Sequence, residues 1–253
     1  MLTFRNINIA SAAILLVLIA ANAGWWPYAI LILVYSAIVF YGSATLSANF
    51  YLPTYCKAPG TNQQIAISFD DGPIEGNTSR ILDILDRYNV KAAFFCIGER
   101  VAATPQIMQD LHRKEHLIGN HTFSHRSTFP ISSVSSMRAE LQDTSKEIRN
   151  SIGLTPKLFR PPYGVINPWI KSAIQKEGYT TIGWSVRSFD TMSPHPKDLL
   201  RRMKQRIAPG NVFLFHDTSE ATISILPDFI ECALSKGYSI VRLDKLFELK
   251  AYD

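Results

Sequence analysis

The first 55 residues of the chain contain a single charged side chain, Arg5, and this constrains the fold more than any other feature. Two apolar stretches, roughly 7–23 and 28–46, flank a Gly-Trp-Trp-Pro turn, and each approaches the roughly 17–25 residues that a helix needs to cross a bilayer. Tryptophan and tyrosine near the ends of these stretches are typical of membrane interfaces. We therefore expect residues 1–50 to form a transmembrane helical hairpin of an integral membrane protein, with the lipid bilayer as a partner.

The first apolar stretch has an alternative interpretation. Arg5, a short apolar core and Ala21-Asn22-Ala23 resemble a signal peptide, which would be cleaved after residues 1–23. The second stretch remains a membrane span in either case. Core helices of a soluble protein are a weaker alternative, because such helices usually carry some polar face.

The remainder of the chain is mildly basic. From Cys56 on it carries 25 Lys and Arg residues, which is all 26 except Arg5, and all 21 Asp and Glu residues. This balance suits an anionic envelope polymer or a lipid surface. It contains no basic run with interleaved aromatics, so we expect no nucleic-acid partner. The three cysteines, Cys56, Cys96 and Cys232, are too few and too scattered for a disulfide framework or a thiolate metal site.

Short apolar runs and amphipathic helix patterns alternate along the rest of the chain, after an expected linker over 51–64 that contains Pro53, Pro59 and Gly60. This alternation predicts parallel strands with crossover helices, and hence one α/β domain over 65–253, closed or partly closed into a barrel. The expected strands are 65–69, 92–97, 117–119, 180–184, 212–215 and 238–241. The expected helices are 78–88, 105–114, 133–152, 168–177, 196–207 and 223–236.

Two adjacent carboxylates, Asp70 and Asp71, follow the first of these strands, and Gly72-Pro73 ends it at once. They therefore lie at the carboxyl end of a strand, where α/β proteins carry their chemistry. Adjacent like charges repel, so a bound metal ion or a division of roles between the two would explain the choice. The alternative is a surface turn capped by Asp.

Two histidines, His121 and His125, follow the strand expected over 117–119. Two imidazoles in one short loop can converge on a metal ion, and histidine is a common zinc ligand. Spacing alone is weak evidence, because His112 and His116 have the same separation. That second pair lies in a charged amphipathic pattern, which indicates a solvated helix face.

Two further signals follow later strands. Arg160-Pro-Pro-Tyr-Gly164 presents Arg160 and Tyr163 on a stiff backbone, and an inward guanidinium would pair with a carboxylate. The alternative is a rigid connector with a surface arginine. His216 ends the apolar run 212–215 and is suited to donating a proton near neutral pH, although a lone histidine after a strand is more often structural.

The ordered motifs SFDDGP (68–73), HTFSH (121–125), RPPYG (160–164) and FLFHD (213–217) closely resemble those of the polysaccharide deacetylases with a NodB homology domain, carbohydrate esterase family 4. The resemblance spans roughly 63–245. It implies a distorted (β/α) barrel of the NodB-homology type with a groove across its top.

Carried over motif by motif, the resemblance also implies roles for individual residues and one divalent metal ion, taken as zinc, with cobalt or manganese as alternatives. Asp70 would be the catalytic base and His216 the general acid. Arg160 would orient Asp70, and the backbone N–H of Tyr163 would help to form the oxyanion site. The metal ligands would be Asp71, His121 and His125.

One motif departs from the family pattern. Relatives often carry Asp-x-x-Asp-Trp after the fifth strand, whereas this chain has Arg187 and Thr191 in place of the first aspartate and the tryptophan. Asp190 matches the second aspartate and is either a supporting partner of the site or a loop cap. The departure puts the substrate and the tuning of His216 in doubt more than the reaction.

We therefore expect a membrane-tethered, metal-dependent hydrolase that removes N-acetyl groups from a sugar of a polysaccharide or lipid-linked glycan. Hydrolysis of another small or cyclic amide is one alternative, and a non-catalytic glycan-binding membrane protein is another. The positions of Lys and Arg would put both ends of the hairpin in the cytoplasm. A glycan substrate favours the outer side, and we expect an extracytoplasmic catalytic domain.

Overall fold

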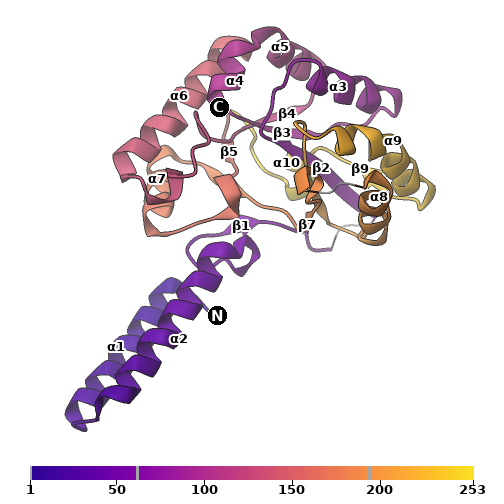
Figure 1. Cartoon of the computed structure of the whole chain (residues 1–253). Coiled ribbons are helices and arrows are strands. Elements are labelled where there is room, and N and C mark those ends of the chain that lie inside the picture. The colour runs from indigo at the N-terminus through magenta and orange to yellow at the C-terminus, as the bar shows by residue number, and fades with distance from the viewer. Residues whose placement is uncertain (1, 61–62, 193–194) are drawn as a thin grey trace.

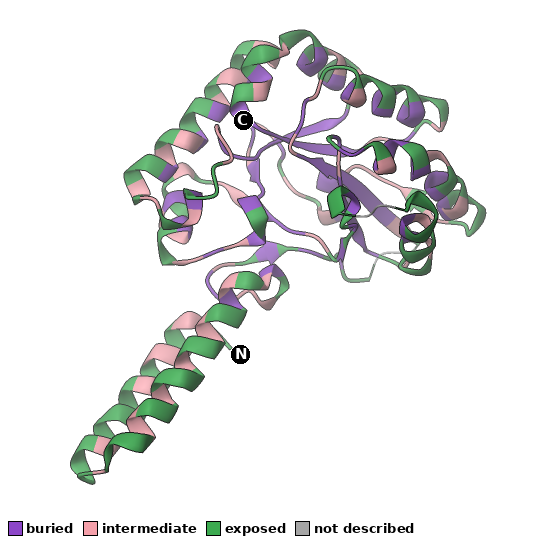
Figure 2. Cartoon of the chain, in the orientation of Figure 1, coloured by how far each residue is buried: buried purple, intermediate pink, exposed green. Residues whose placement is uncertain are grey.

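The computed structural model describes residues 2–60, 63–192 and 195–253 and shows an N-terminal helical hairpin attached to an α/β domain (Figure 1). The hairpin consists of α1 (Phe4–Ala20) and α2 (Trp25–Ala44), which lie side by side and project from the domain. The residues of both helices are exposed or intermediate along their length, apart from the buried Gly42 of α2 (Figure 2). By length and composition α2 could cross a membrane, and α1 is a shorter apolar helix of 17 residues.

The domain is built on one parallel sheet. Within the described residues the strand order is β1-β6-β5-β4-β3-β2-β8-β7, with β9 paired to β2, and every pairing is parallel. The sheet curls into a half-barrel with β1 and β7 as its edges, which confirms the predicted distorted (β/α) barrel. The strands are β1 (Thr54–Tyr55), β2 (Gln64–Asp70), β3 (Ala93–Cys96), β4 (Leu117–Asn120), β5 (Leu158–Phe159), β6 (Thr180–Ile182), β7 (Val186–Arg187), β8 (Val212–His216) and β9 (Ser239–Ile240).

Most helices cover the outside of the curled sheet (Figure 1). Leu243 and Leu246, in the last helix, pack instead against the opposite face of the central strands. The central strands are buried on both faces, which explains why β2 and β8 are continuous apolar runs rather than alternating ones. Aromatic rings of β2, β3, β8 and α9 (Glu220–Ser235) pack against one another in the main core. The helices of the domain are α3 (Asn77–Arg87), α4 (Gly98–Ala103), α5 (Pro105–Arg113), α6 (Val134–Ile152), α7 (Pro168–Glu177), α8 (Pro196–Gln205), α9 (Glu220–Ser235) and α10 (Leu243–Phe247). Four short 3-10 helices lie at Leu46–Ala48, Phe129–Ile131, Pro162–Gly164 and Asp190–Met192 in the described residues.

The segment expected to be a linker contributes to the domain. Its strand β1 pairs with β6, and Cys56 and Ala58 are buried. Residues 61–62 of this segment lie outside the described residues. Two-residue strands such as β1, β5 and β7 are too short to show a periodic pattern, so the sequence did not predict them. The domain boundaries themselves remain a prediction.

The interpretation of the second histidine pair was wrong for one of its members. His112 is exposed on α5, but His116 is buried just beyond that helix, at the amino end of β4. Its Nδ1 accepts a hydrogen bond from the Ala92 N–H at 3.1 Å. Burial lowers the pKa of His116 to about 4, so this histidine is a neutral core residue.

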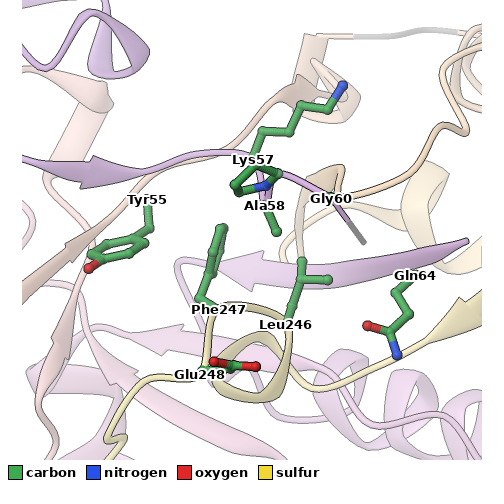
Figure 3. A pocket seen from close by; sticks show the side chains of 9 residues that line it. Tyr55, Lys57, Ala58, Gly60, Gln64, Leu246, Phe247 and Glu248 are labelled. Atoms are coloured by element: carbon green, nitrogen blue, oxygen red, sulfur yellow. The ribbon is translucent and has the colours of Figure 1, made fainter. Parts of the chain in front are cut away.

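A cavity of about 540 Å³ lies at the amino end of β2 (Figure 3). It is lined by β1, by the chain that follows β1 and by the end of α10, and Lys57 and Glu248 are its charged side chains. Gln64, which starts β2, also lines it. The cavity is therefore at the opposite end of β2 from Asp70 and Asp71.

Candidate active site

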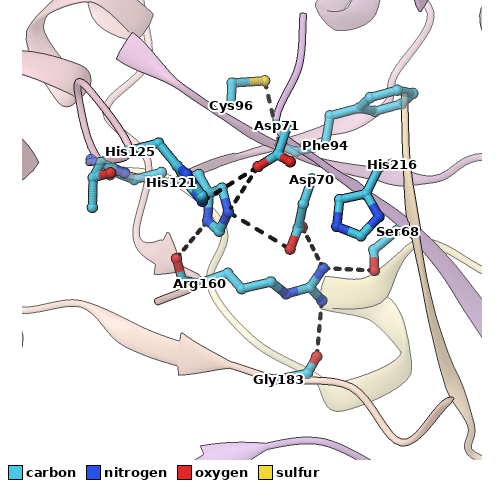
Figure 4. A network of polar contacts seen from close by, with 12 residues as sticks. Ser68, Asp70, Asp71, Phe94, Cys96, His121, His125, Arg160, Gly183 and His216 are labelled. Atoms are coloured by element: carbon cyan, nitrogen blue, oxygen red, sulfur yellow. Dashed lines mark hydrogen bonds and ion pairs between the residues drawn. The ribbon is translucent and has the colours of Figure 1, made fainter. Parts of the chain in front are cut away.

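The polar residues singled out in the sequence meet at the carboxyl ends of the strands, which we call the catalytic edge (Figure 4). Asp70 is the last residue of β2 and is the register partner of His216, the last residue of β8. His121 follows β4, and Arg160 follows β5. Carboxyl ends of parallel strands share one edge, so residues distant in sequence converge there.

Asp71, His121 and His125 form a cluster of three side chains that could hold a metal ion. Their ligand atoms all lie within 4.8 Å of one another. Asp71 Oδ1 is 3.5 Å from His121 Nε2 and 3.4 Å from His125 Nε2. Two ligands bound at about 2.0–2.2 Å to a tetrahedral ion lie about 3.3–3.6 Å apart. The donor set and its spacing therefore fit a divalent metal ion.

The hydrogen bonds around His121 select the ring nitrogen that faces this cluster. Its Nδ1 is 2.7 Å from the carbonyl oxygen of Arg160, and that nitrogen must carry a proton in order to donate to a carbonyl. In the neutral ring the unprotonated Nε2 then points toward Asp71. This is the arrangement by which a second hydrogen bond fixes a metal-binding tautomer.

The ionisation of the cluster favours an anionic Asp71 beside a neutral His125. Burial lowers the pKa of His121, but the charges of Asp70 and Asp71 outweigh it and raise that pKa. Burial raises the pKa of Asp71, but the hydrogen bond and charge of His121 outweigh it and hold that pKa well below its usual range. Burial, helped by the nearby charge of His121, lowers the pKa of His125 to about 4. Metal ions bind the deprotonated forms of both residue types.

Arg160 holds the other carboxylate, Asp70. The arginine is fully buried, and its Nη1 donates to Asp70 Oδ1 at 2.7 Å and to Ser68 Oγ at 2.8 Å. Its Nη2 donates to the Gly183 carbonyl at 2.9 Å, and the guanidinium lies 4.1 Å from the centre of the Phe95 ring. Such a charge-assisted pair fixes the orientation of the Asp70 carboxylate.

His216 is oriented by Asp190. His216 Nδ1 lies 2.7 Å from Asp190 Oδ1, and the His216 backbone N–H donates to Asp190 Oδ2 at 2.7 Å. Burial lowers the pKa of His216, but the hydrogen bond and charge of Asp190 outweigh it, so the pKa lies above the usual value. Asp190 also accepts from the N–H of Thr191, so it serves both as a partner of His216 and as a loop cap.

Tyr163 lies at the rim of the site. Its ring centre is 4.9 Å from that of His125, its hydroxyl donates to the His125 carbonyl at 3.1 Å, and 47% of the residue is exposed. The loops of the catalytic edge carry several non-glycine residues in the left-handed region, a strained conformation that clusters at functional sites. They are Asp71 (φ 73°), Thr122 (φ 67°), His125 (φ 50°), Tyr163 (φ 60°) and Phe189 (φ 55°).

Sequence reasoning missed the residues that support these loops. Glu140 of α6 accepts hydrogen bonds from the N–H groups of Phe123 and Ser124, at 2.9 and 2.8 Å, and so anchors the loop that carries both histidines. The hydroxyl of Thr222, in α9, donates a hydrogen bond to Asp190 and so supports the partner of His216. Glu140 gives no local signal, because its partners lie 16 and 17 residues away. Ser68 does give one, as the only polar residue of the apolar run before Asp70.

The two departures from the family pattern lie beside the site. The Arg187 guanidinium is 5.6 Å from the centre of the Trp184 ring and 4.9 Å from that of Phe189, so it stacks between two aromatic side chains. Thr191 is exposed. The position that holds an aspartate in many relatives therefore carries a positive charge here.

Comparison with known proteins identifies the family. A sequence profile described as polysaccharide deacetylase matches residues 57–182. A Bacillus cereus peptidoglycan-N-acetylglucosamine deacetylase is 30% identical over 197 residues, which are 76% of this chain and 71% of that protein. The chain belongs to the polysaccharide deacetylase family.

Other relatives agree. The peptidoglycan-N-acetylglucosamine deacetylase PgdA of Listeria monocytogenes is 31% identical over 202 residues, which are 78% of this chain but only 42% of that protein. The crystal structure of the Bc1960 peptidoglycan N-acetylglucosamine deacetylase, bound to 4-naphthalen-1-yl-N-oxidanyl-benzamide, superposes with a TM-score of 0.73 at 28% identity. The match covers 77% of this chain and 92% of that one. The family assignment thus extends over the α/β domain of this chain.

Proposed function

We propose that the chain is a metal-dependent hydrolase that removes N-acetyl groups from an amino sugar of a glycan. The observation that carries this proposal is the cluster of Asp71, His121 and His125 beside a buried, arginine-bound Asp70. His216 lies at the end of the neighbouring strand, with Asp190 behind it. A base, a metal site and an acid are thus available at one edge of the sheet.

Asp71, His121 and His125 would hold the metal ion. A carboxylate with two imidazoles suits zinc, and cobalt or manganese can use the same donors. A divalent ion bound there supplies Lewis-acid polarisation of the acetamide carbonyl and makes a water molecule more acidic. Three protein ligands leave positions open for water and substrate.

The remaining groups move the protons. Asp70, oriented by Arg160, takes a proton from the attacking water as the water oxygen bonds to the acetamide carbon. The backbone N–H of Tyr163 donates to the oxyanion that develops on the carbonyl oxygen. His216, whose pKa is raised by Asp190, gives its proton to the leaving nitrogen as the C–N bond breaks. The products are acetate and a free amino sugar.

The substrate and the location follow from the relatives and the hairpin. Two relatives are named for deacetylation of peptidoglycan N-acetylglucosamine, which supports an envelope glycan, either a polymer or a lipid-linked precursor. The apolar α2 supports anchoring in a cell membrane. A glycan of the envelope favours a catalytic domain that faces the outside of the cell.

The test is release of acetate from N-acetylglucosamine oligomers by the full chain in detergent. We expect acetate and free amine in equal amounts with zinc or cobalt, and loss of both after chelation. Small cyclic amides, assayed in parallel, provide the control for a different amidase. The proposal is wrong if cyclic amides are hydrolysed and the oligomers are not, or if the protein binds the oligomers but releases no acetate with any divalent metal.

A further inference from the structure

The helical hairpin is joined directly to the catalytic edge. The carbonyl of Ser43, in the last turn of α2, accepts a hydrogen bond from the N–H of Ile166 at 3.0 Å. Carbonyls of a last helical turn have no partner within the helix, so this bond satisfies one of them. Ile166 lies three residues after Tyr163, whose ring packs on His125.

An apolar cluster strengthens this junction. Leu46, Phe50, Tyr51 and Cys56 form a buried cluster with Ile166. Trp184, which follows β6, packs against the same cluster, and so does Phe4 at the start of α1. The domain-proximal end of the hairpin and the loops of the catalytic edge therefore form one packed unit.

The length of the hairpin fixes where the membrane surface would lie. Helices of 17 and 20 residues are about 26 and 30 Å long, close to the hydrocarbon thickness of a bilayer of about 30 Å. Trp25 and Trp26, at the tip, would mark the far interface. The near interface then falls at Phe4 and Ser43, level with Ile166.

Two large apolar side chains are exposed in the segments next to Ile166. Trp169 lies in the first turn of α7, three residues after Ile166, and is 56% exposed. Ile131 is 79% exposed. Asn167, just before α7, donates a hydrogen bond from its Nδ2 to the Pro130 carbonyl at 2.6 Å. This bond holds the segment that carries Ile131 beside the start of α7. We call Ile131 and Trp169 the apolar rim.

The charge around the apolar rim suits an anionic lipid surface. The segments 121–139 and 154–176, which carry the rim and the site residues His121, His125, Arg160 and Tyr163, contain no Asp or Glu. Arg126 and Lys171 lie in them. The segments after β2, β3 and β8 differ, since each carries an exposed glutamate, namely Glu75 in a loop, Glu99 in α4 and Glu220 at the start of α9. A basic and apolar side that is continuous with a membrane hairpin is typical of a lipid-binding surface.

We propose that the apolar rim inserts into the headgroup region of the bilayer beside the hairpin, so that the catalytic edge opens along the membrane surface. The enzyme would then act on N-acetylated glycan held at that surface by a lipid, in preference to free glycan in solution. This inference rests on the proposed deacetylation and on membrane anchoring by the hairpin.

The position of the rim can be measured without catalysis. A Trp25→Phe/Trp26→Phe protein and its Trp169→Phe derivative, in vesicles of anionic phospholipid, isolate the emission of Trp169 by difference. We expect nitroxide-labelled lipid headgroups to quench this emission and the bilayer to shield it from acrylamide. Quenching by acrylamide alone would overturn the proposal. Shielding from acrylamide without nitroxide quenching would also overturn it, because protein rather than lipid would then cover the rim.

The predicted preference for lipid-tethered substrate can be tested with a rim variant and a matched control variant. Ile131→Glu/Trp169→Glu should lower acetate release from a lipid-tethered N-acetylglucosamine oligomer at least tenfold, and that from the free oligomer less than twofold. Leu234→Glu, which alters an exposed leucine of α9, should change neither. Equal loss on both substrates, or no loss, would contradict the proposal. A wild-type protein inactive on both substrates would refute the proposed function, while the quenching result would still decide where the rim lies.

Discussion

Two pairs of histidines in this chain have the same spacing but lie in different environments. His121 and His125 follow a strand at the catalytic edge, where Asp71 lies 3.5 and 3.4 Å from their Nε2 atoms. Of the other pair, His112 is exposed on a helix, and His116 is buried at the amino end of β4. The spacing alone therefore does not make a metal site. The edge of the sheet makes the difference, because it brings a carboxylate from another strand to the histidines and so completes a set of side chains that could hold a metal ion.

The comparison also separates two effects of burial. Burial and the charge of its neighbour lower the pKa of His125, which keeps it neutral and able to bind a cation. Burial likewise lowers the pKa of His116, but the Ala92 N–H already occupies its Nδ1. Burial thus keeps both imidazoles neutral: His125 with a ring nitrogen facing Asp71 at one edge of the sheet, and His116 as a core residue at the other.

The largest effect should come from removing one histidine of the catalytic edge. His121→Ala should abolish tight binding of zinc and lower acetate release roughly 10³–10⁴-fold, because a bound ion contributes several kcal/mol to stabilising the transition state. Calorimetric titration with zinc and an acetate assay measure the two quantities. His112→Ala is the matched control and should bind zinc like the wild type. Equal loss of zinc binding and of acetate release in both variants would contradict the proposed difference between the two histidine pairs.

Asp70→Asn should separate the base from the metal site. The amide keeps the shape of the side chain but cannot take a proton, so kcat should fall about 10²–10⁴-fold while zinc binding persists. Zinc content and kcat are measured on the same preparation. Full activity with metal bound would refute the role of Asp70 proposed above.

Asp190→Asn should reveal the partner of the acid. A general acid must be protonated, so activity falls as pH rises through its pKa, and Asp190 raises the pKa of His216. The substitution should therefore move the alkaline limb of the kcat/KM profile to lower pH. It should also reduce kcat about 10–100-fold, as expected for a group that orients a functional histidine. An unmoved alkaline limb would assign that limb to another group.

The smallest effect on activity should come from His116→Ala, at the amino end of the sheet. It leaves the buried Ala92 N–H without its acceptor, which should cost about 1–3 kcal/mol of unfolding free energy, with acetate release unchanged. The wild-type histidine has a pKa of about 4 when folded and near 6.5 when unfolded, so it takes up a proton on unfolding between these values. Its contribution to stability is therefore present above pH 6.5 and is lost as the pH falls toward 4. Denaturant titrations over this range should show a weaker pH dependence in the variant.

The sequence predicted the parts of the fold that have a strong local pattern. The long buried run of β2 and the amphipathic pattern of α7 were visible in it, and the motifs marked the strand ends that carry Asp70, His121 and His216. It could not predict contacts that depend on the assembled sheet. Glu140 supports the histidine loop from a helix surface, and the carbonyl of Ser43 binds the N–H of Ile166. His116 was misread because a charged local pattern conceals a residue that the fold buries.

X-ray absorption at the zinc edge, on the full chain loaded with one equivalent of zinc, tests the central claim most directly. The account predicts a spectrum with two imidazole ligands and one carboxylate, which loses one imidazole in His125→Ala and is unchanged in His112→Ala. A spectrum with no imidazole, or one that His125→Ala leaves unchanged, would contradict it.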